Sequence, residues 1–204
     1  MKLFLKLTAC ILISIQSVSV KAQDADKYPD YVIIKKGDTI VCSIKTPFLS
    51  MESVYKTEAS KKTIRILPWQ VKEYYINRDS ITYLSVRKNG VKVPDFMKAI
   101  EKGAINLLEE RYIKMGGTPG VSGYMSSTTN WYISKGSDTA RSLKTSELFF
   151  NKSKKSRKNI FIDMIKDKQE IYDKYLADDS FTFEELRTIV HLYNTGKWVT
   201  EFKR

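Results

Sequence analysis

Side chains suited to acid–base or nucleophilic chemistry are scarce in this sequence. The 204 residues include one histidine, His191, and two cysteines, Cys10 and Cys42. Zinc sites usually take three or four protein ligands, so His191 and Cys42 would need carboxylates to complete one. No serine lies in a Gly-x-Ser-x-Gly context that would pair it with His191 as a nucleophile. We therefore expect no enzyme, no metal site and no cofactor, with His191 on the surface and Cys42 packed in a strand.

The carboxylates do not change this expectation. They occur as adjacent pairs, Glu109-Glu110, Asp178-Asp179 and Glu184-Glu185. Neighbouring residues of a helix or strand point in different directions, and a glycosidase-type acid/base pair needs two carboxyl groups aimed at one site. A hydrolase whose site converges only in the folded molecule stays open as the second alternative.

Two surfaces are candidates for ligand binding. Aromatic residues alternate with lysine and arginine in the first two thirds of the chain, a pattern that suits glycan stacking as well as ordinary cross-strand packing. The aromatic candidates are Trp69, Tyr74, Trp131 and Tyr132. A basic run could contact a polyanion, although it could equally be a solvated lead into a helix. The basic candidates are Lys152, Lys154, Lys155, Arg157 and Lys158.

Turn signals divide the first part of the chain into strands. Gly37-Asp38 separates two β-branched runs, and polar or Asn-Gly segments separate the later ones. The pattern predicts hairpins at 31–45 and 53–67 and further strands at 71–76 and 81–86. We expect a short helix at 95–102, capped by Asp95 and ended by Gly103. Strands are then predicted at 104–115, 130–134 and 139–143, with a flexible loop over 116–129.

The last third changes to helical periodicity. Apolar residues recur at helical spacing from Ile160 to Ile165 and again from Ile171 to Leu176. Thr182-Phe183-Glu184-Glu185 is a capping box, and Gly196 marks the end of the final helix. Strands followed by helices indicate an α+β fold. We expect a small, twisted antiparallel sheet or partial β-barrel at about 28–145, with helices that pack on it or extend as an arm.

Four short segments, taken in order, resemble a known group of proteins. They are residues 30–40 with the Gly-Asp-Thr turn, residues 96–107, the strand 131–135 and the helix 183–194. The set is similar to uncharacterised exported proteins of Bacteroidota that have an N-terminal β-hairpin region and C-terminal helices. The resemblance implies a cell-envelope location and this architecture, and it implies no chemistry.

The N-terminus has the features of a secretion signal. Lys2 and Lys6 precede an apolar run at 7–15, and small and polar residues lead to Ala22, after which we expect cleavage. The run is shorter than the roughly 20 residues of a membrane span. Residues 7–10 resemble a lipoprotein box, but the apolar run before Cys10 is very short. The expected organisation is a signal peptide at 1–22, a β-rich domain at 23–145 and a helical segment at 146–204.

Charge limits the class of partner. Loss of Lys2, Lys6 and Lys21 with the leader leaves 32 basic and 23 acidic residues, a net charge of +9. Such an excess favours polyanions, and export disfavours nucleic acid among them. We expect a periplasmic, outer-membrane-associated or secreted protein that binds or scaffolds an envelope protein without catalysis. The alternative is a module that binds a glycan, an anionic lipid surface or another polyanion.

Overall fold

The computed structural model describes most of the chain after residue 29. The described residues are 30–46, 53–60, 62–116, 124–137, 139–146, 153–178, 180–199 and 202. The expected signal peptide with Cys10, the basic residue Lys152 and part of the expected loop lie outside them. Among the helices described, none is both long and apolar enough to cross a membrane.

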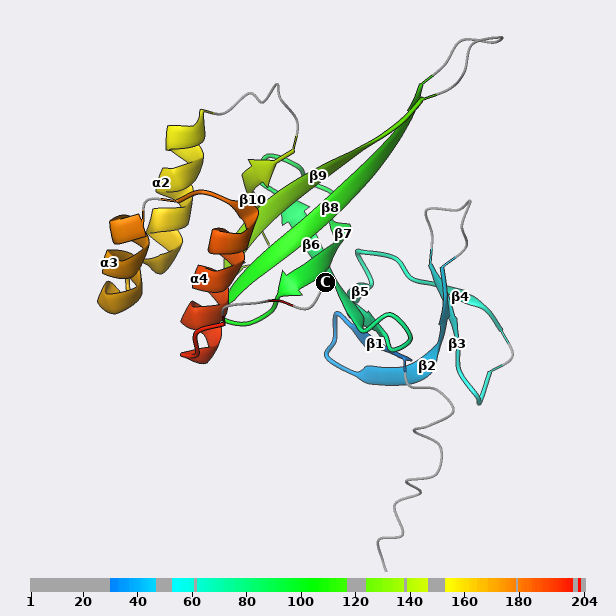
Figure 1. Cartoon of the computed structure of the whole chain (residues 1–204). Helices are drawn as coiled ribbons and strands as arrows, with labels where there is room; N and C mark the ends of the chain where they lie inside the picture. The colour runs from blue at the N-terminus through cyan, green and yellow to red at the C-terminus, as the bar shows by residue number, and fades with distance from the viewer. Residues whose placement is uncertain are drawn as a thin grey trace, which may run out of the picture.

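Ten strands in the described residues form one sheet (Figure 1). They are β1 (Asp30–Ile34), β2 (Thr39–Lys45), β3 (Val54–Lys56), β4 (Ile64–Arg65), β5 (Val71–Ile76), β6 (Ile81–Lys88), β7 (Asp95–Glu101), β8 (Ile105–Gly116), β9 (Tyr124–Lys135) and β10 (Thr139–Thr145). Their order is β10-β9-β8-β7-β6-β5-β1-β2-β3-β4, and all neighbours in this order are antiparallel. Most strands therefore pair with their neighbour along the chain, as expected for a sheet built from hairpins.

The sheet curls without becoming a clear barrel. β10 also pairs in parallel with β6, but only at Thr139–Arg87 and Ala140–Lys88. Only two residue pairs take part, and β6 also pairs with β5 and β7, so the contact curls the sheet without closing it. The predicted α+β class is confirmed, and the barrel geometry is not.

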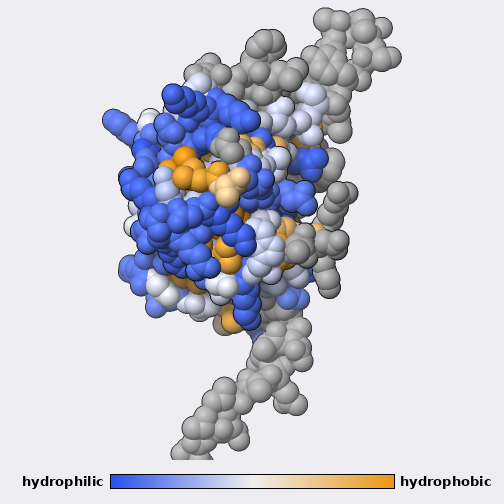
Figure 2. Space-filling model, turned by 60° about the vertical axis from the view of Figure 1, so that its left-hand side comes forward, coloured by the Kyte–Doolittle hydropathy of each residue, from blue (hydrophilic) through white to orange (hydrophobic). Residues whose placement is uncertain are grey.

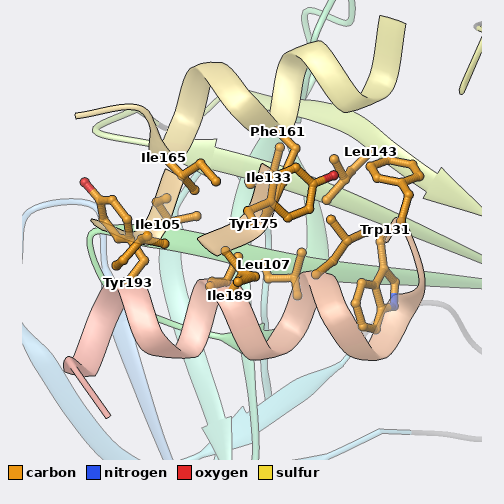
Figure 3. Close-up of a cluster of buried hydrophobic side chains, with 14 residues drawn as sticks. Ile105, Leu107, Trp131, Ile133, Leu143, Phe161, Ile165, Tyr175, Ile189 and Tyr193 are labelled. Atoms are coloured by element: carbon orange, nitrogen blue, oxygen red, sulfur yellow. The ribbon is translucent and has the colours of Figure 1, made fainter. Parts of the chain in front are cut away.

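Three helices in the described residues follow the strands and cover one face of the sheet (Figure 1). They are α2 (Lys154–Ile165), α3 (Gln169–Asp178) and α4 (Phe183–Thr195). The helical segment is thus packed on the sheet and is not a separate arm. Side chains from all three helices and from β8, β9 and β10 point toward one another in a single core (Figure 3). Buried members of this core include Leu107, Ile133, Phe161, Tyr175 and Ile189.

Two smaller clusters complete the interior. One lies among the N-terminal strands, around Val32, Cys42 and Tyr74. The other lies on the opposite face of the sheet from the helices and includes Met97 and Leu108. Leu107 and Leu108 fall in different clusters because successive side chains of a strand point to opposite faces.

The final helix has the ends that its sequence predicts. The Thr182 hydroxyl accepts the amide of Glu185 at 3.0 Å, and Gly196 adopts the left-handed conformation with φ of 70°. Phe181 and Leu186 are both buried, as a hydrophobic staple requires. The Thr182 cap and the glycine stop are therefore confirmed as local determinants of α4.

Two predictions of secondary structure are wrong. The expected helix at 95–102 is strand β7, which pairs with β6 through Leu84–Met97 and with β8 through Ala99–Leu108. The expected loop includes residues 126–129, which instead belong to β9. In both cases pairing with the neighbouring strands overrides the local preference of the segment.

Candidate functional site

The four aromatic candidates do not form one surface. Trp69 is exposed, with 59% of its area accessible, whereas Tyr74 and Trp131 are buried. Tyr74 stacks on Tyr83 at a centroid distance of 4.8 Å, and burial raises the pKa of its phenol to about 12. Trp131 and Tyr132 are adjacent in β9 and therefore point to opposite faces of the sheet. Only Trp69 of the four offers an open ring.

Tyr132 belongs to a network of polar side chains from strands β6, β8 and β9. Its hydroxyl donates to Glu110 at 2.9 Å, and the Lys88 ammonium pairs with the same carboxylate. Lys88 also donates to the Tyr112 hydroxyl at 2.8 Å. Burial and the Glu110 charge raise the pKa of Tyr132, so it stays a neutral donor. The network ties β6 to β8 and β9.

The basic candidates within the described residues lie at the start of α2. Lys154 and Lys155 are exposed, and Arg157 and Lys158 are half-buried. Arg157 Nη1 donates to the Leu143 carbonyl at 3.3 Å, which joins α2 to β10. The basic run of the sequence thus lies on a defined face of the folded chain.

His191, predicted to lie on the surface, is half-buried and paired with Glu101. Its Nδ1 lies 3.0 Å from Glu101 Oε2, and Arg187 Nε donates to Glu101 Oε1 at 2.9 Å. Phe202 covers this group, with its ring 3.9 Å from the Arg187 guanidinium. Within the described residues no hydroxyl or thiol contacts the imidazole. The arrangement fastens α4 to β7.

Cys42 is fully buried in β2, as its alternating strand predicts. Burial raises the pKa of its thiol to about 12, so the thiolate is disfavoured at neutral pH. A search of the described residues finds no group of three His, Cys, Asp or Glu side chains placed to hold a metal ion.

An open groove of about 710 Å³ lies where β7 and β8 meet the start of α4. Two aromatic rings form its wall, since Phe183 packs edge-on against Trp131 at 4.6 Å. Trp131 Nε1 donates to Glu109 at 3.2 Å, and Lys98 lies 3.9 Å from the same residue. Lys98 and Glu109 thus pair with each other, and the groove has mixed polarity. The lining residues are Asp79, Ser80, Ile81, Lys98, Ala99, Ile100, Glu109, Trp131, Phe183, Glu184, Arg187 and Phe202.

β8 and β9 form a two-stranded extension of the sheet. β8 and β9 pair continuously from Ile105–Lys135 to Gly116–Tyr124. β7 pairs with β8 only as far as Glu109, and β10 pairs with β9 only as far as Asn130. Beyond these points the two strands project from the rest of the sheet (Figure 1). We call residues 110–116 and 124–129 the ribbon.

The sequence missed the residues that organise these surfaces. Glu101 was placed in a helix, and its partners Arg187 and His191 lie 86 and 90 residues away. No local pattern reports such a contact. The ribbon had a weak signal, because Ser126–Thr129 adjoin the predicted strand at 130–134 and include two β-branched threonines.

The described residues form an α+β fold with a projecting ribbon, an open groove and a basic start to helix α2. Comparison with family models, curated proteins and solved structures finds no match to the chain.

Proposed function

We propose that this chain is an exported, non-catalytic binding module that presents its ribbon to a protein partner in the cell envelope. The N-terminal leader pattern supports export, and the ribbon supports binding. The observation that carries the proposal is the outer edge of β9 beyond the end of β10, which pairs with no other strand among the described residues.

The direction of the backbone groups on this edge follows from one contact. Ser146 N donates to the Thr129 carbonyl, and Thr129 N donates to the Ser146 hydroxyl, both at 2.9 Å. The backbone groups of Thr129 therefore point away from β8. In an antiparallel pair this direction alternates along the strand, so those of Ser127 and Met125 also point outward. The edge thus offers two N–H and two C=O groups to a partner strand.

Residues 124–130 lack the side chains that usually prevent strand addition. Residues 124–130 include no charged residue and no proline, and such residues are the usual protection of an exposed edge. The ribbon also exposes large side chains from β8, since Tyr112 is 42% and Ile113 is 60% accessible. A partner strand could gain affinity from backbone hydrogen bonds and specificity from these side chains.

Site-specific crosslinking in cells that naturally produce the protein tests the proposal. A benzoylphenylalanine at position 113 should give a discrete adduct in the envelope fraction, and the same group at exposed Lys166 should not. Ser127→Pro removes an outward N–H and leaves the β8 pairing intact, so it should abolish the adduct. Ser127→Ala keeps the N–H and should retain it.

Circular dichroism of the Ser127→Pro protein checks that the fold is preserved. An adduct that persists in a folded Ser127→Pro protein would exclude strand addition at this edge. Equal adducts from positions 113 and 166, or adducts confined to the cytosol, would overturn the proposal.

A further inference from the structure

A cluster of cations surrounds Phe181, where β10 meets α2. Lys144 Nζ lies 5.3 Å from the centre of the Phe181 ring, and the Arg157 guanidinium lies 5.8 Å from it. Lys144 also donates to the Phe181 carbonyl at 2.7 Å. Two cations from different elements are thus held beside one ring. Lys154 and Lys155 continue the cluster onto the exposed first turn of α2.

The described residues place little negative charge at the start of α2. The first turn of α2 contains no acidic residue. In the part of the chain that the structure describes, Lys154 and Lys155 form no ion pair, and the hydrogen bond of Lys144 goes to a carbonyl. Burial, with the Arg157 and Lys154 charges, lowers the pKa of Lys144. The surroundings of Lys144 are therefore positive.

Figure 2 shows that the helical side of the molecule is mostly hydrophilic. A face of this kind suits a charged surface better than an apolar partner. Cations clustered at the positive end of a helix repel one another and the helix dipole, and a bound anion would relieve both. Phosphate groups, with several acceptor oxygens and a full charge, match such a cluster.

We propose that the basic face made by Lys144, Lys154, Lys155 and Arg157 binds the phosphate groups of anionic lipids at a membrane surface. Single-stranded nucleic acid fits less well, because its bases need exposed rings to stack on. Phe181 is only 4% exposed, and Phe183 is half-buried against Trp131. Among the residues that the structure describes, this surface can hold phosphates and offers no open ring for bases.

Cosedimentation of the chain without residues 1–22 with lipid vesicles tests this proposal. Vesicles of equal parts phosphatidylglycerol and phosphatidylcholine should bind it, and phosphatidylcholine alone should not. Each lysine near an anionic surface contributes about fivefold in affinity, so Lys154→Gln with Lys155→Gln should weaken binding about 25-fold. The matched control is Lys35→Gln with Lys36→Gln, which removes the same charge from an exposed turn.

The outcomes distinguish a specific lipid site from a general attraction of the positive chain to anions. Equal losses in the two double variants would show that net charge alone drives binding and would overturn the site. Displacement by millimolar inorganic phosphate, or tighter retention on DNA than on vesicles, would overturn the lipid assignment. The Ser127→Pro protein should bind vesicles normally, because this inference is independent of the ribbon.

Discussion

Helices α2 and α4 begin with the same hydrogen bond and opposite charges. Ser153 caps α2 by accepting the Ser156 amide at 3.2 Å, and Thr182 caps α4 in the same way at 3.0 Å. α4 has two glutamates in its first turn, whereas α2 has none and begins with two lysines. Acids stabilise this end of a helix and cations destabilise it. The start of α4 is complemented by its own glutamates, and we propose that an external anion complements the start of α2.

We expect α4 to contribute more than the other helices to the stability with which the helices pack on the sheet. Leu186→Ala removes a fully buried side chain from the largest core cluster and should lower the free energy of unfolding by about 2–5 kcal/mol. Denaturant titration measures the change. Leu176→Ala on α3, where the leucine is 42% exposed, is the control and should cost about 0.5 kcal/mol or less. Similar losses at the two positions would contradict this expectation.

The same helix shows how much of the fold can be predicted from sequence. α4 has its cap, its apolar stripe and its glycine stop within fifteen residues, so a local pattern specifies it. The pattern of β7 misled, because Phe96, Met97 and Ile100 recur at a helix-like spacing. Met97 is buried only because β6 and β8 pair on either side of it. This pairing depends on residues outside β7, so residues 95–101 alone do not indicate it.

The candidate surfaces could also be predicted only in part from the sequence. The basic run at the start of α2 was visible in the sequence because its lysines are consecutive. Lys144, which completes the basic face, was not visible in this way, because it lies on β10, ten residues before Lys154. The outward edge of Ser127 depends on where β10 stops pairing with β9, and no property of residues 124–130 alone determines that.

A second prediction concerns the other end of α4. The Asn194 side chain accepts from Ile105 N at 2.9 Å and donates to Ile105 O at 2.8 Å. Asn194→Ala would leave both groups of a buried residue unpaired and should cost about 1–3 kcal/mol. A methyl group added at Gly103 would lie 2.5 Å from the Asn194 amide carbon, so Gly103→Ala should displace the same contact.

A double-mutant cycle sharpens this result. Gly103→Ala should cost much less in the Asn194→Ala background than in the native chain, because the contact is already lost. Thermal and denaturant unfolding of the four proteins give the coupling. Additive effects would mean that the two residues act separately and that Asn194 does not join α4 to the start of β8.

The smallest expected effect on stability comes from reversing the charge in the first turn of α2 or α4. Lys155 and Glu184 are both the second residue of their helix and both exposed. Lys155→Glu should stabilise the fold by about 0.5–1 kcal/mol, and Glu184→Lys should destabilise it by a similar amount, because each reverses a charge near the positive helix end. Both effects should shrink at high salt.

The same two substitutions should affect vesicle binding differently from stability. Lys155→Glu should weaken binding by about fivefold or more while the protein becomes more stable, and Glu184→Lys should leave binding nearly unchanged. A stabilising substitution that removes binding separates a functional charge from a structural one. If Lys155→Glu instead lowers stability, the lysine contributes to the fold itself, and the start of α2 cannot be regarded as an open site for an anion.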